Sequence, residues 1–182
     1  MLFDLGGVLV EVSSVDSLQS LLTAPLDKTE IRKRLVASPL LRQFEVGALE
    51  PTDFANQFVH EWDLRVSPED FLVEFRGWSR ALLPGARELL ASLRPRYRLA
   101  ALSNSNQVHR ERNTEVLGVT ALFDAAFSSH QLGCHKPEPA IYREALRRLG
   151  ARDQGIAAFH VRGVEELTQS LREHGFILDA AV

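Results

Sequence analysis

The first ten residues place a carboxylate at the end of an apolar run. Residues 1–3 are apolar, Asp4 follows them directly, and the chain then turns at Gly6 and Gly7. In open α/β sheets, functional groups lie at the carboxyl ends of the strands. The pattern predicts a buried strand that presents Asp4 at such an edge. Because strands typically run about 5–6 residues, either this strand is short or the natural chain begins upstream of Met1.

Strand and helix patterns alternate in the second half of the chain. Strands are expected at residues 97–102, 123–127, 156–159 and 176–178. Helices are expected from Pro84 to Leu93 and at residues 106–116, 137–149 and 163–174. Alternation of this kind implies a parallel sheet with right-handed crossovers. The predicted fold class is therefore α/β.

The segment between these two parts shows repeated helix starts and little strand pattern. Asp27 begins a capping box with Glu30, Pro51 starts a second helix, and Ser67 caps a third. The apolar stripes of such helices need partners, so a compact four-helix-like unit is expected, with the two tryptophans in its core. We predict a core domain of residues 1–13 and 81–182 and a helical cap domain of residues 14–80.

Composition and charge argue against several classes of partner. The chain has 182 residues, of which 45% are hydrophobic and 25% are charged, and its formal net charge is -3. This balance gives no reason to expect nucleic acid or an anionic membrane as a partner. No stretch approaches the roughly 20 apolar residues that cross a bilayer, and Asp4 interrupts any N-terminal signal segment. Cys134 is the only cysteine. We expect a soluble cytoplasmic protein.

Two later motifs join Asp4 in a characteristic order. Ser103-Asn104 ends the apolar run at 97–102, and the run Lys-Pro-Glu-Pro-Ala-Ile-Tyr begins at Lys136. This order resembles the haloacid dehalogenase-like (HAD) hydrolase superfamily over almost the whole chain. The resemblance implies a HAD-like Rossmannoid three-layer sandwich with a parallel sheet, plus a small helical cap inserted after the first strand.

The resemblance also implies a role for each motif. Asp4 would be the nucleophile that attacks a phosphomonoester and forms an aspartyl-phosphate. Ser103 and Asn104 would bind a phosphate oxygen, and Lys136 would neutralise the nucleophile and the transferring phosphoryl group. Taken singly, the same residues are also typical of turns and surface loops.

Two positions depart from the family pattern. The position two residues after the nucleophile usually carries an aspartate that acts as general acid, and here it is Gly6. Losing such an acid typically costs about 10²–10⁴ in rate. The acid pair that usually follows the last core strand would fall at His160-Val161 or at Arg162-Gly163, where there is no carboxylate.

The missing acids weaken the expected metal site. Mg²⁺ prefers oxygen ligands in octahedral geometry, and Asp4 with the Gly6 carbonyl is an incomplete set. Glu165 or Glu166 is a candidate replacement ligand, although acids at the start of a helix also favour the helix dipole. His160 would suit a transition metal better than Mg²⁺, unless it is only a buried or turn residue.

Two further residues have alternative interpretations. Arg42 lies in a segment that resembles the family's cap helix facing the site, where it would contact substrate or help a halide leave; a solvated helical arginine is the simpler reading. Cys134 precedes Lys136, but no His/Asp arrangement suggests a cysteine nucleophile, so we assign it to packing.

Three functions remain open. The first is a weak phosphatase that acts on a small phosphate ester. The second is a catalytically degenerate HAD-fold protein that keeps an anion pocket and binds a ligand. The third is a 2-haloacid dehalogenase, which uses no metal. A cap that closes over the site implies a small-molecule substrate or anion as the ligand.

Overall fold

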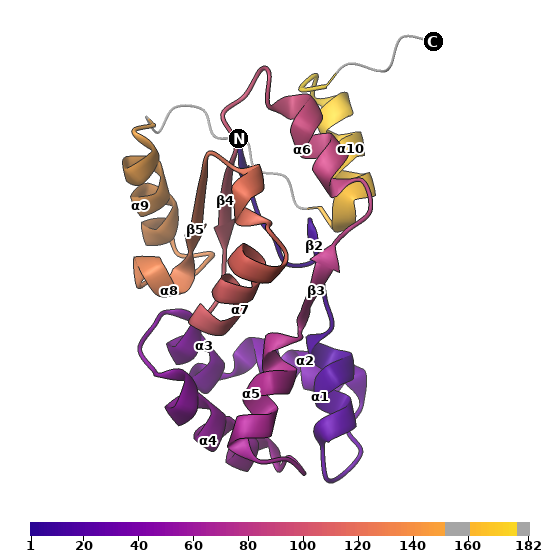
Figure 1. Cartoon of the computed structure of the whole chain (residues 1–182), viewed down its shortest axis with the longest axis vertical. Helices are drawn as coiled ribbons and strands as arrows, with labels where there is room; N and C mark the ends of the chain where they lie inside the picture. The colour runs from indigo at the N-terminus through magenta and orange to yellow at the C-terminus, as the bar shows by residue number, and fades with distance from the viewer. Residues whose placement is uncertain (152–160, 178–182) are drawn as a thin grey trace.

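The computed structural model describes residues 1–151 and 161–177 of the chain (Figure 1). Within these ranges a parallel sheet contains three strands in the order β1-β4-β5, namely β1 (Leu2–Phe3), β4 (Ala100–Ser103) and β5 (Ala125–Ser128). Every residue of β4 is buried, as expected for a strand between two neighbours. The predicted α/β class and parallel sheet are confirmed. The strand predicted at 156–159 lies outside the described residues.

Helices cover both faces of this sheet. α6 (Ala86–Leu93) and α10 (Gly163–Glu173) pack on one face, and α9 (Pro139–Leu149) packs on the other (Figure 1). Side chains alternate across a strand, so neighbouring residues of β4 enter different clusters. Ala101 packs with residues of α6 and α10, whereas Leu102 packs with Ile141 and Ala145 of α9. The three layers of the predicted sandwich are therefore present.

One predicted strand is wrong. Phe176 and Ile177 form a bend instead of a strand, and Leu178 lies outside the described residues. The bend follows from the end of α10, where Gly175 adopts φ +72° and the Phe176 amide donates to the Leu171 carbonyl at 2.8 Å. This is a helix-terminating arrangement that a glycine favours. Phe176 then packs edge-on against Tyr97, with ring centroids 6.2 Å apart.

Five helices occupy residues 14–76, between β1 and α6 of the chain. They are α1 (Ser14–Leu21), α2 (Lys28–Ala37), α3 (Pro39–Glu45), α4 (Pro51–Trp62) and α5 (Pro68–Arg76). The start signals at Asp27 and Ser67 are confirmed, since both side chains accept a backbone N–H of the first turn. The sequence predicted four helices, and α1 is the helix for which it offered no start signal. Its N-cap residue, Ser13, makes no side-chain capping hydrogen bond.

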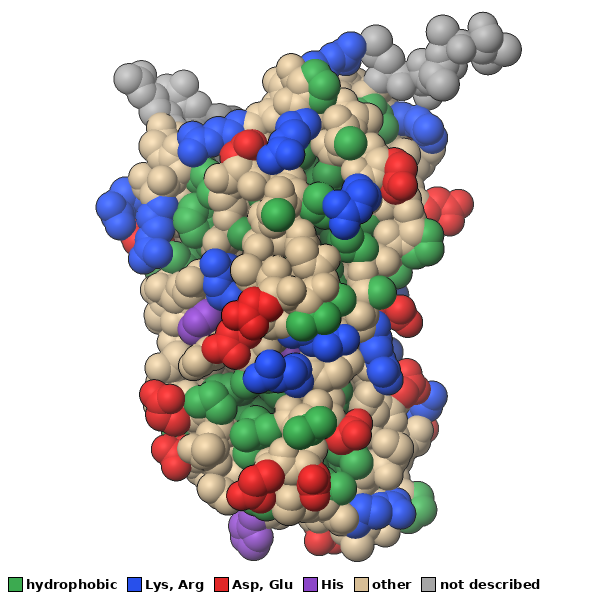
Figure 2. Space-filling model, viewed as in Figure 1, with side chains coloured by type: hydrophobic (Ala, Val, Ile, Leu, Met, Phe, Trp, Pro, Cys, Tyr) green, Lys and Arg blue, Asp and Glu red, His purple; other side chains and the backbone are tan. Residues whose placement is uncertain are grey.

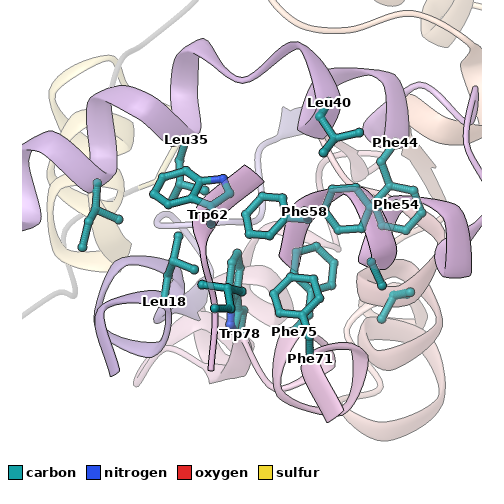
Figure 3. Close-up of a cluster of buried hydrophobic side chains, with 14 of the residues drawn as sticks. Leu18, Leu35, Leu40, Phe44, Phe54, Phe58, Trp62, Phe71, Phe75 and Trp78 are labelled. Carbon is teal, nitrogen blue, oxygen red and sulfur yellow. The ribbon is translucent and has the colours of Figure 1, made fainter. Parts of the chain in front are cut away.

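These helices enclose an aromatic cluster of their own. Figure 3 shows its side chains pointing toward one another from α3, α4 and α5. Phe58 is fully buried and stacks on Phe71 and Trp62 at centroid distances of 5.0 and 5.5 Å. Trp62 and Trp78 are 1% and 2% exposed, so both belong to this core as predicted. The helical unit therefore has a packed interior separate from the two clusters on the sheet.

A short antiparallel ribbon joins the helical unit to the sheet. It pairs β2 (Val10–Val12) with β3 (Ser79–Leu82) and was not predicted, because strands of three and four residues give too little alternation. Val10 lies opposite Leu82, so the chain enters and leaves the helical unit side by side. The remaining elements are α7 (Gln107–Glu111), the π-helix Arg112–Val116, the 3₁₀ turn Thr120–Leu122 and α8 (Ser129–Leu132).

The surface carries mixed charge. Figure 2 shows acidic and basic side chains interspersed over the visible face. None of the helices in the described part of the chain has the length and apolarity of a membrane span.

The aromatic cluster generates a stability prediction. Replacing Phe58 with alanine removes a fully buried ring and should lower the free energy of unfolding by about 3–5 kcal/mol. Urea unfolding followed by tryptophan fluorescence measures this change. The control is Val73→Ala on α5, where Val73 is 71% exposed; it should change stability by less than about 0.5 kcal/mol. Equal effects of the two substitutions would contradict the assigned core.

His109 of α7 joins the sheet unit to the helical unit in its neutral form. Its ring stacks on Phe75 with centroids 4.3 Å apart, and its Nε2 lies 2.7 Å from the Phe75 carbonyl oxygen. Asn106 Nδ2 lies 3.1 Å from its Nδ1. Burial lowers the pKa of His109 from 6.5 to about 4. The charged form of His109 is therefore disfavoured in this partly buried position.

The lowered pKa of His109 predicts the direction in which stability changes with pH. Its contribution to stability is fully present above pH 6.5 and is lost as the pH falls toward the folded-state pKa of about 4. Unfolding free energies of the wild type and His109→Gln should therefore converge on acidification, by about 3 kcal/mol between neutral pH and pH 4. Urea titrations at several pH values measure this difference. If the unfolding free energies of the two proteins change in parallel with pH, the lowered pKa of His109 in the folded state is contradicted.

Candidate functional site

Asp4 leaves β1 at the carboxyl edge of the sheet and is followed by a tight turn. The amides of Val8, Leu9 and Val10 all point to the Leu5 carbonyl, at 3.2, 2.9 and 2.8 Å. Gly7 adopts φ +74°, a conformation in which a side chain would be strained. The Leu5 amide donates to Asp4 Oδ1 at 2.7 Å. The Gly-Gly signal therefore has a structural reason, which is to reverse the chain and fix the Asp4 carboxylate.

Lys136 meets Asp4 from the loop before α9. Its Nζ lies 2.8 Å from Asp4 Oδ1 and also donates to the Leu102 carbonyl at 2.9 Å. The Lys136 side chain is 16% exposed, whereas that of Asp4 is 44% exposed. An ammonium group has three N–H donors, and these two contacts leave one for a ligand. The structure thus brings together the first and third motifs of the sequence, with the carboxylate facing solvent and the cation partly shielded.

Asn104 holds the backbone of this lysine. Its Oδ1 accepts the Lys136 amide at 2.8 Å, and its Nδ2 donates to the Lys136 carbonyl at 3.1 Å. Both polar ends of the side chain are therefore engaged with the Lys136 loop. The Ser103 hydroxyl is buried at the end of β4 and donates a long hydrogen bond of 3.4 Å to the Asn104 carbonyl. The phosphate-binding roles of Ser103 and Asn104 stay predictions.

Two residues of this neighbourhood were not singled out by the sequence. His135 Nε2 lies 2.8 Å from Glu45 Oε2, and the two side chains are 18% and 20% exposed. Asn104 Nδ2 lies 3.2 Å from the other ring nitrogen, Nδ1. The hydrogen bond with Glu45 raises the pKa of His135 above its usual value, and partial burial opposes this. The available signals were the adjacency of His135 to Lys136 and the spacing of Glu45 from Arg42 on one short helix.

Arg42 lies beside the site and is paired with an acid. Its guanidinium forms an ion pair with Glu138, two residues after Lys136. This contact joins α3 to the start of α9. The predicted position of Arg42 on a helix near the site agrees with this geometry, and its contact with substrate stays a prediction. Cys134 is partly buried and close to Leu132, and burial raises the pKa of its thiol, so it is not an activated nucleophile.

The start of α10 approaches the turn after Asp4. The Gly163 amide donates to the Gly7 carbonyl at 2.8 Å. Glu166 Oε2 accepts the Arg162 amide at 2.7 Å, so this carboxylate caps the start of its own helix. Glu165 is exposed in the same turn. The role of either acid as a metal ligand stays a prediction.

The described residues do not complete a magnesium site. In residues 1–151 and 161–177, no three histidine, cysteine or acidic side chains gather in a metal-binding arrangement. Asp4 and the Gly6 carbonyl would supply two oxygen donors to Mg²⁺, and water or ligand oxygens would have to fill the rest of its octahedral shell. His160 lies outside the described residues.

Two curated relatives share part of this sequence. Haloacid dehalogenase-like hydrolase domain-containing protein 3 of Mus musculus is 32% identical over 125 residues, which are 58% of this chain and 48% of that protein. Glyceraldehyde 3-phosphate phosphatase of Methanothermobacter thermautotrophicus is 30% identical over 111 residues, 50% of this chain and 48% of that protein. The chain thus spans about half the length of the curated relatives it matches.

Solved structures share the fold. A HAD-family enzyme of Bacteroides thetaiotaomicron, crystallised with magnesium and inorganic phosphate, superposes with a TM-score of 0.67 at 21% identity, over 82% of this chain and 78% of that one. A HAD-like hydrolase of Porphyromonas gingivalis gives a TM-score of 0.65 at 24% identity, over 83% and 76%. The family model for haloacid dehalogenase-like hydrolases matches residues 1–160. The chain belongs to the haloacid dehalogenase-like hydrolase family.

Proposed function

We propose that this protein hydrolyses small phosphate esters through an aspartyl-phosphate formed on Asp4. The observation that carries the proposal is the contact of 2.8 Å between the Asp4 carboxylate and the Lys136 ammonium at the carboxyl edge of the sheet. A nucleophile beside a fixed cation suits the transfer of an anionic group. Support also comes from the relative named as a phosphatase and from the phosphate-bound enzyme of similar fold.

The first step transfers the phosphoryl group to the protein. Asp4 Oδ1 is held by Leu5 N–H and Lys136, whereas Oδ2 has no hydrogen-bond partner among the described residues and is the attacking atom. A bond forms between this oxygen and phosphorus as the bond to the ester oxygen breaks. The leaving oxygen takes its proton from water, because Gly6 has no side chain to supply one. The free N–H of Lys136 stabilises the charge on the phosphoryl oxygens.

The second step regenerates the carboxylate. A water oxygen attacks the phosphorus of the aspartyl-phosphate, and the bond from phosphorus to Asp4 breaks. The products are inorganic phosphate and the free Asp4 carboxylate, and the proton lost by water goes to solvent. Without a positioned acid and base, both steps should be slow, and substrates with good leaving groups should react fastest.

We assign residues 14–80 as a cap domain over a core domain of residues 1–13 and 81–182. Supporting this division, the five helices have their own aromatic core and connect to the sheet through the β2–β3 ribbon. α3 contacts the loops around Lys136 through Arg42 and Glu45. A helical unit at this position limits access to the site, which favours a small-molecule substrate.

A second candidate function is ligand binding without turnover. Gly6 provides no general acid, and the described residues assemble no cluster of metal ligands. A protein of this kind would keep the Lys136 anion site and lose the chemistry. Dehalogenation of a 2-haloacid is less favoured, because Arg42 is already paired with Glu138.

The phosphatase proposal predicts hydrolysis of p-nitrophenyl phosphate. Turnover should be abolished by Asp4→Asn, which keeps the shape of the side chain and removes the nucleophilic charge. The assay follows release of p-nitrophenol with Mg²⁺, Mn²⁺ or Co²⁺ and with EDTA, using circular dichroism as the folding control. Absence of turnover above Asp4→Asn under every condition would contradict the proposal and favour ligand binding.

The structure also predicts that Gly6→Asp increases activity. Gly6 does not have a positive φ, and a Cβ there would lie 3.4 Å from Val12 Cγ2, an ordinary contact. A carboxylic acid at this position can protonate the leaving oxygen, with an expected gain of about 10²-fold for an alkyl phosphate and much less for p-nitrophenyl phosphate. Ratios of kcat for the two esters measure this. An equal change with both esters would contradict the missing-acid explanation.

A further inference from the structure

A continuous series of hydrogen bonds leads from the helical unit to Lys136. Glu45, the last residue of α3, binds His135 Nε2 at 2.8 Å. Asn104 Nδ2 lies 3.2 Å from His135 Nδ1. The same side-chain amide accepts the Lys136 N–H at 2.8 Å and donates to the Lys136 carbonyl at 3.1 Å. Lys136 then reaches Asp4. Every member of this series except Asp4 is at least partly buried.

The orientation of the Asn104 amide fixes which nitrogen of His135 carries hydrogen. Oδ1 of Asn104 must accept, because its partner is the backbone N–H of Lys136. Nδ2 of Asn104 is then a donor toward Nδ1 of His135, so Nδ1 accepts and Nε2 carries the hydrogen. That hydrogen points to the Glu45 carboxylate. Glu45 therefore orients the ring in the tautomer that Asn104 can bind.

The end of α3 is itself fixed to the core. The Glu45 carbonyl accepts the hydroxyl of Ser129, a fully buried residue that also receives the Ser105 amide at 2.9 Å. Two residues later, Gly47 has φ +76°, and a Cβ there would lie 2.8 Å from the His130 carbonyl. The chain after α3 therefore packs directly against α8, leaving no space for a side chain. Glu45 is held by both its main chain and its side chain.

We propose that Glu45 is a positioning residue: through His135 and Asn104 it holds the loop that places Lys136 beside Asp4. In this arrangement, the position of the Lys136 ammonium depends on the packing of α3 against the core. Arg42 and Glu138 face the same junction and form the neighbouring ion pair. The catalytic consequence rests on the proposed phosphatase function, whereas the geometric consequence does not.

The geometric consequence is measurable without turnover. The chain has three lysines, and Lys28 and Lys33 are 60% and 71% exposed on α2. Labelling with a limiting amine-reactive acetyl ester, read by peptide mass spectrometry, gives the rate at Lys136 relative to these internal references. Glu45→Ala should increase this relative rate on the order of tenfold, the ratio expected from losing one hydrogen bond to a charged group. Glu45→Gln, which can still accept from Nε2–H, should remain close to wild type.

The control is Glu74→Ala, which truncates an exposed glutamate of α5. If the Glu45→Ala protein fails to fold, Glu45→Asp replaces it in the labelling experiment. The aspartate side chain is one methylene shorter, so its carboxylate does not reach His135. The proposal would be overturned if Lys136 were labelled at the same relative rate in the folded Glu45 variant as in Glu74→Ala.

Kinetics then separate the two proposals. With p-nitrophenyl phosphate, Glu45→Ala should lower kcat on the order of tenfold and change KM by less than about threefold, and Glu45→Gln should restore kcat. If the wild type has no turnover but Lys136 labelling responds to Glu45→Ala, the phosphatase function fails and the positioning role stands. If turnover is present and neither kcat nor labelling responds, the positioning role fails and the phosphatase function stands.

Discussion

The contact between Asp4 and Lys136 is the interaction on which the rest of the arrangement depends. It brings opposite charges to 2.8 Å at the edge of the sheet, and each partner needs a separate piece of architecture. Asp4 needs the tight Gly-Gly turn after β1. Lys136 needs its loop, which Asn104 holds from the end of β4. Parallel strand order brings both loops to one edge, so the sheet topology itself creates the site.

The helical unit contacts the sheet unit through two histidines. α3 reaches the loop beside Lys136 through Glu45 and His135, while α5 reaches α7 through His109. These two histidines have opposite electrostatic surroundings, because burial lowers the pKa of His109 and Glu45 raises that of His135. The junction between the helical unit and the sheet therefore contains one histidine whose pKa is lowered and one whose pKa is raised. In the proposed arrangement, Glu45 makes the position of the Lys136 ammonium depend on the packing of α3 against the core.

Local apolar runs in the sequence predicted the three strands β1, β4 and β5. The pairing of Asp4 with Lys136 was implied by the resemblance of their motifs to the HAD family. The β2–β3 ribbon and the Glu45–His135 contact could not be predicted. Glu45 and His135 are 90 residues apart, and their pairing depends on the packing of α3 against α8, which leaves no periodic pattern. The strand predicted at 176–178 was wrong because Gly175 terminates α10, and the chain then bends back over the helix end.

Trapping the covalent intermediate tests the central claim most directly. Wild-type protein would be mixed with p-nitrophenyl phosphate, quenched in acid within the first turnover and digested at low pH for peptide mass spectrometry. We expect the N-terminal peptide to gain the mass of one phosphoryl group on Asp4, and the Asp4→Asn protein to show no such gain. Turnover with no adduct on Asp4, or with an adduct on another residue, would contradict the assignment of Asp4 as the nucleophile.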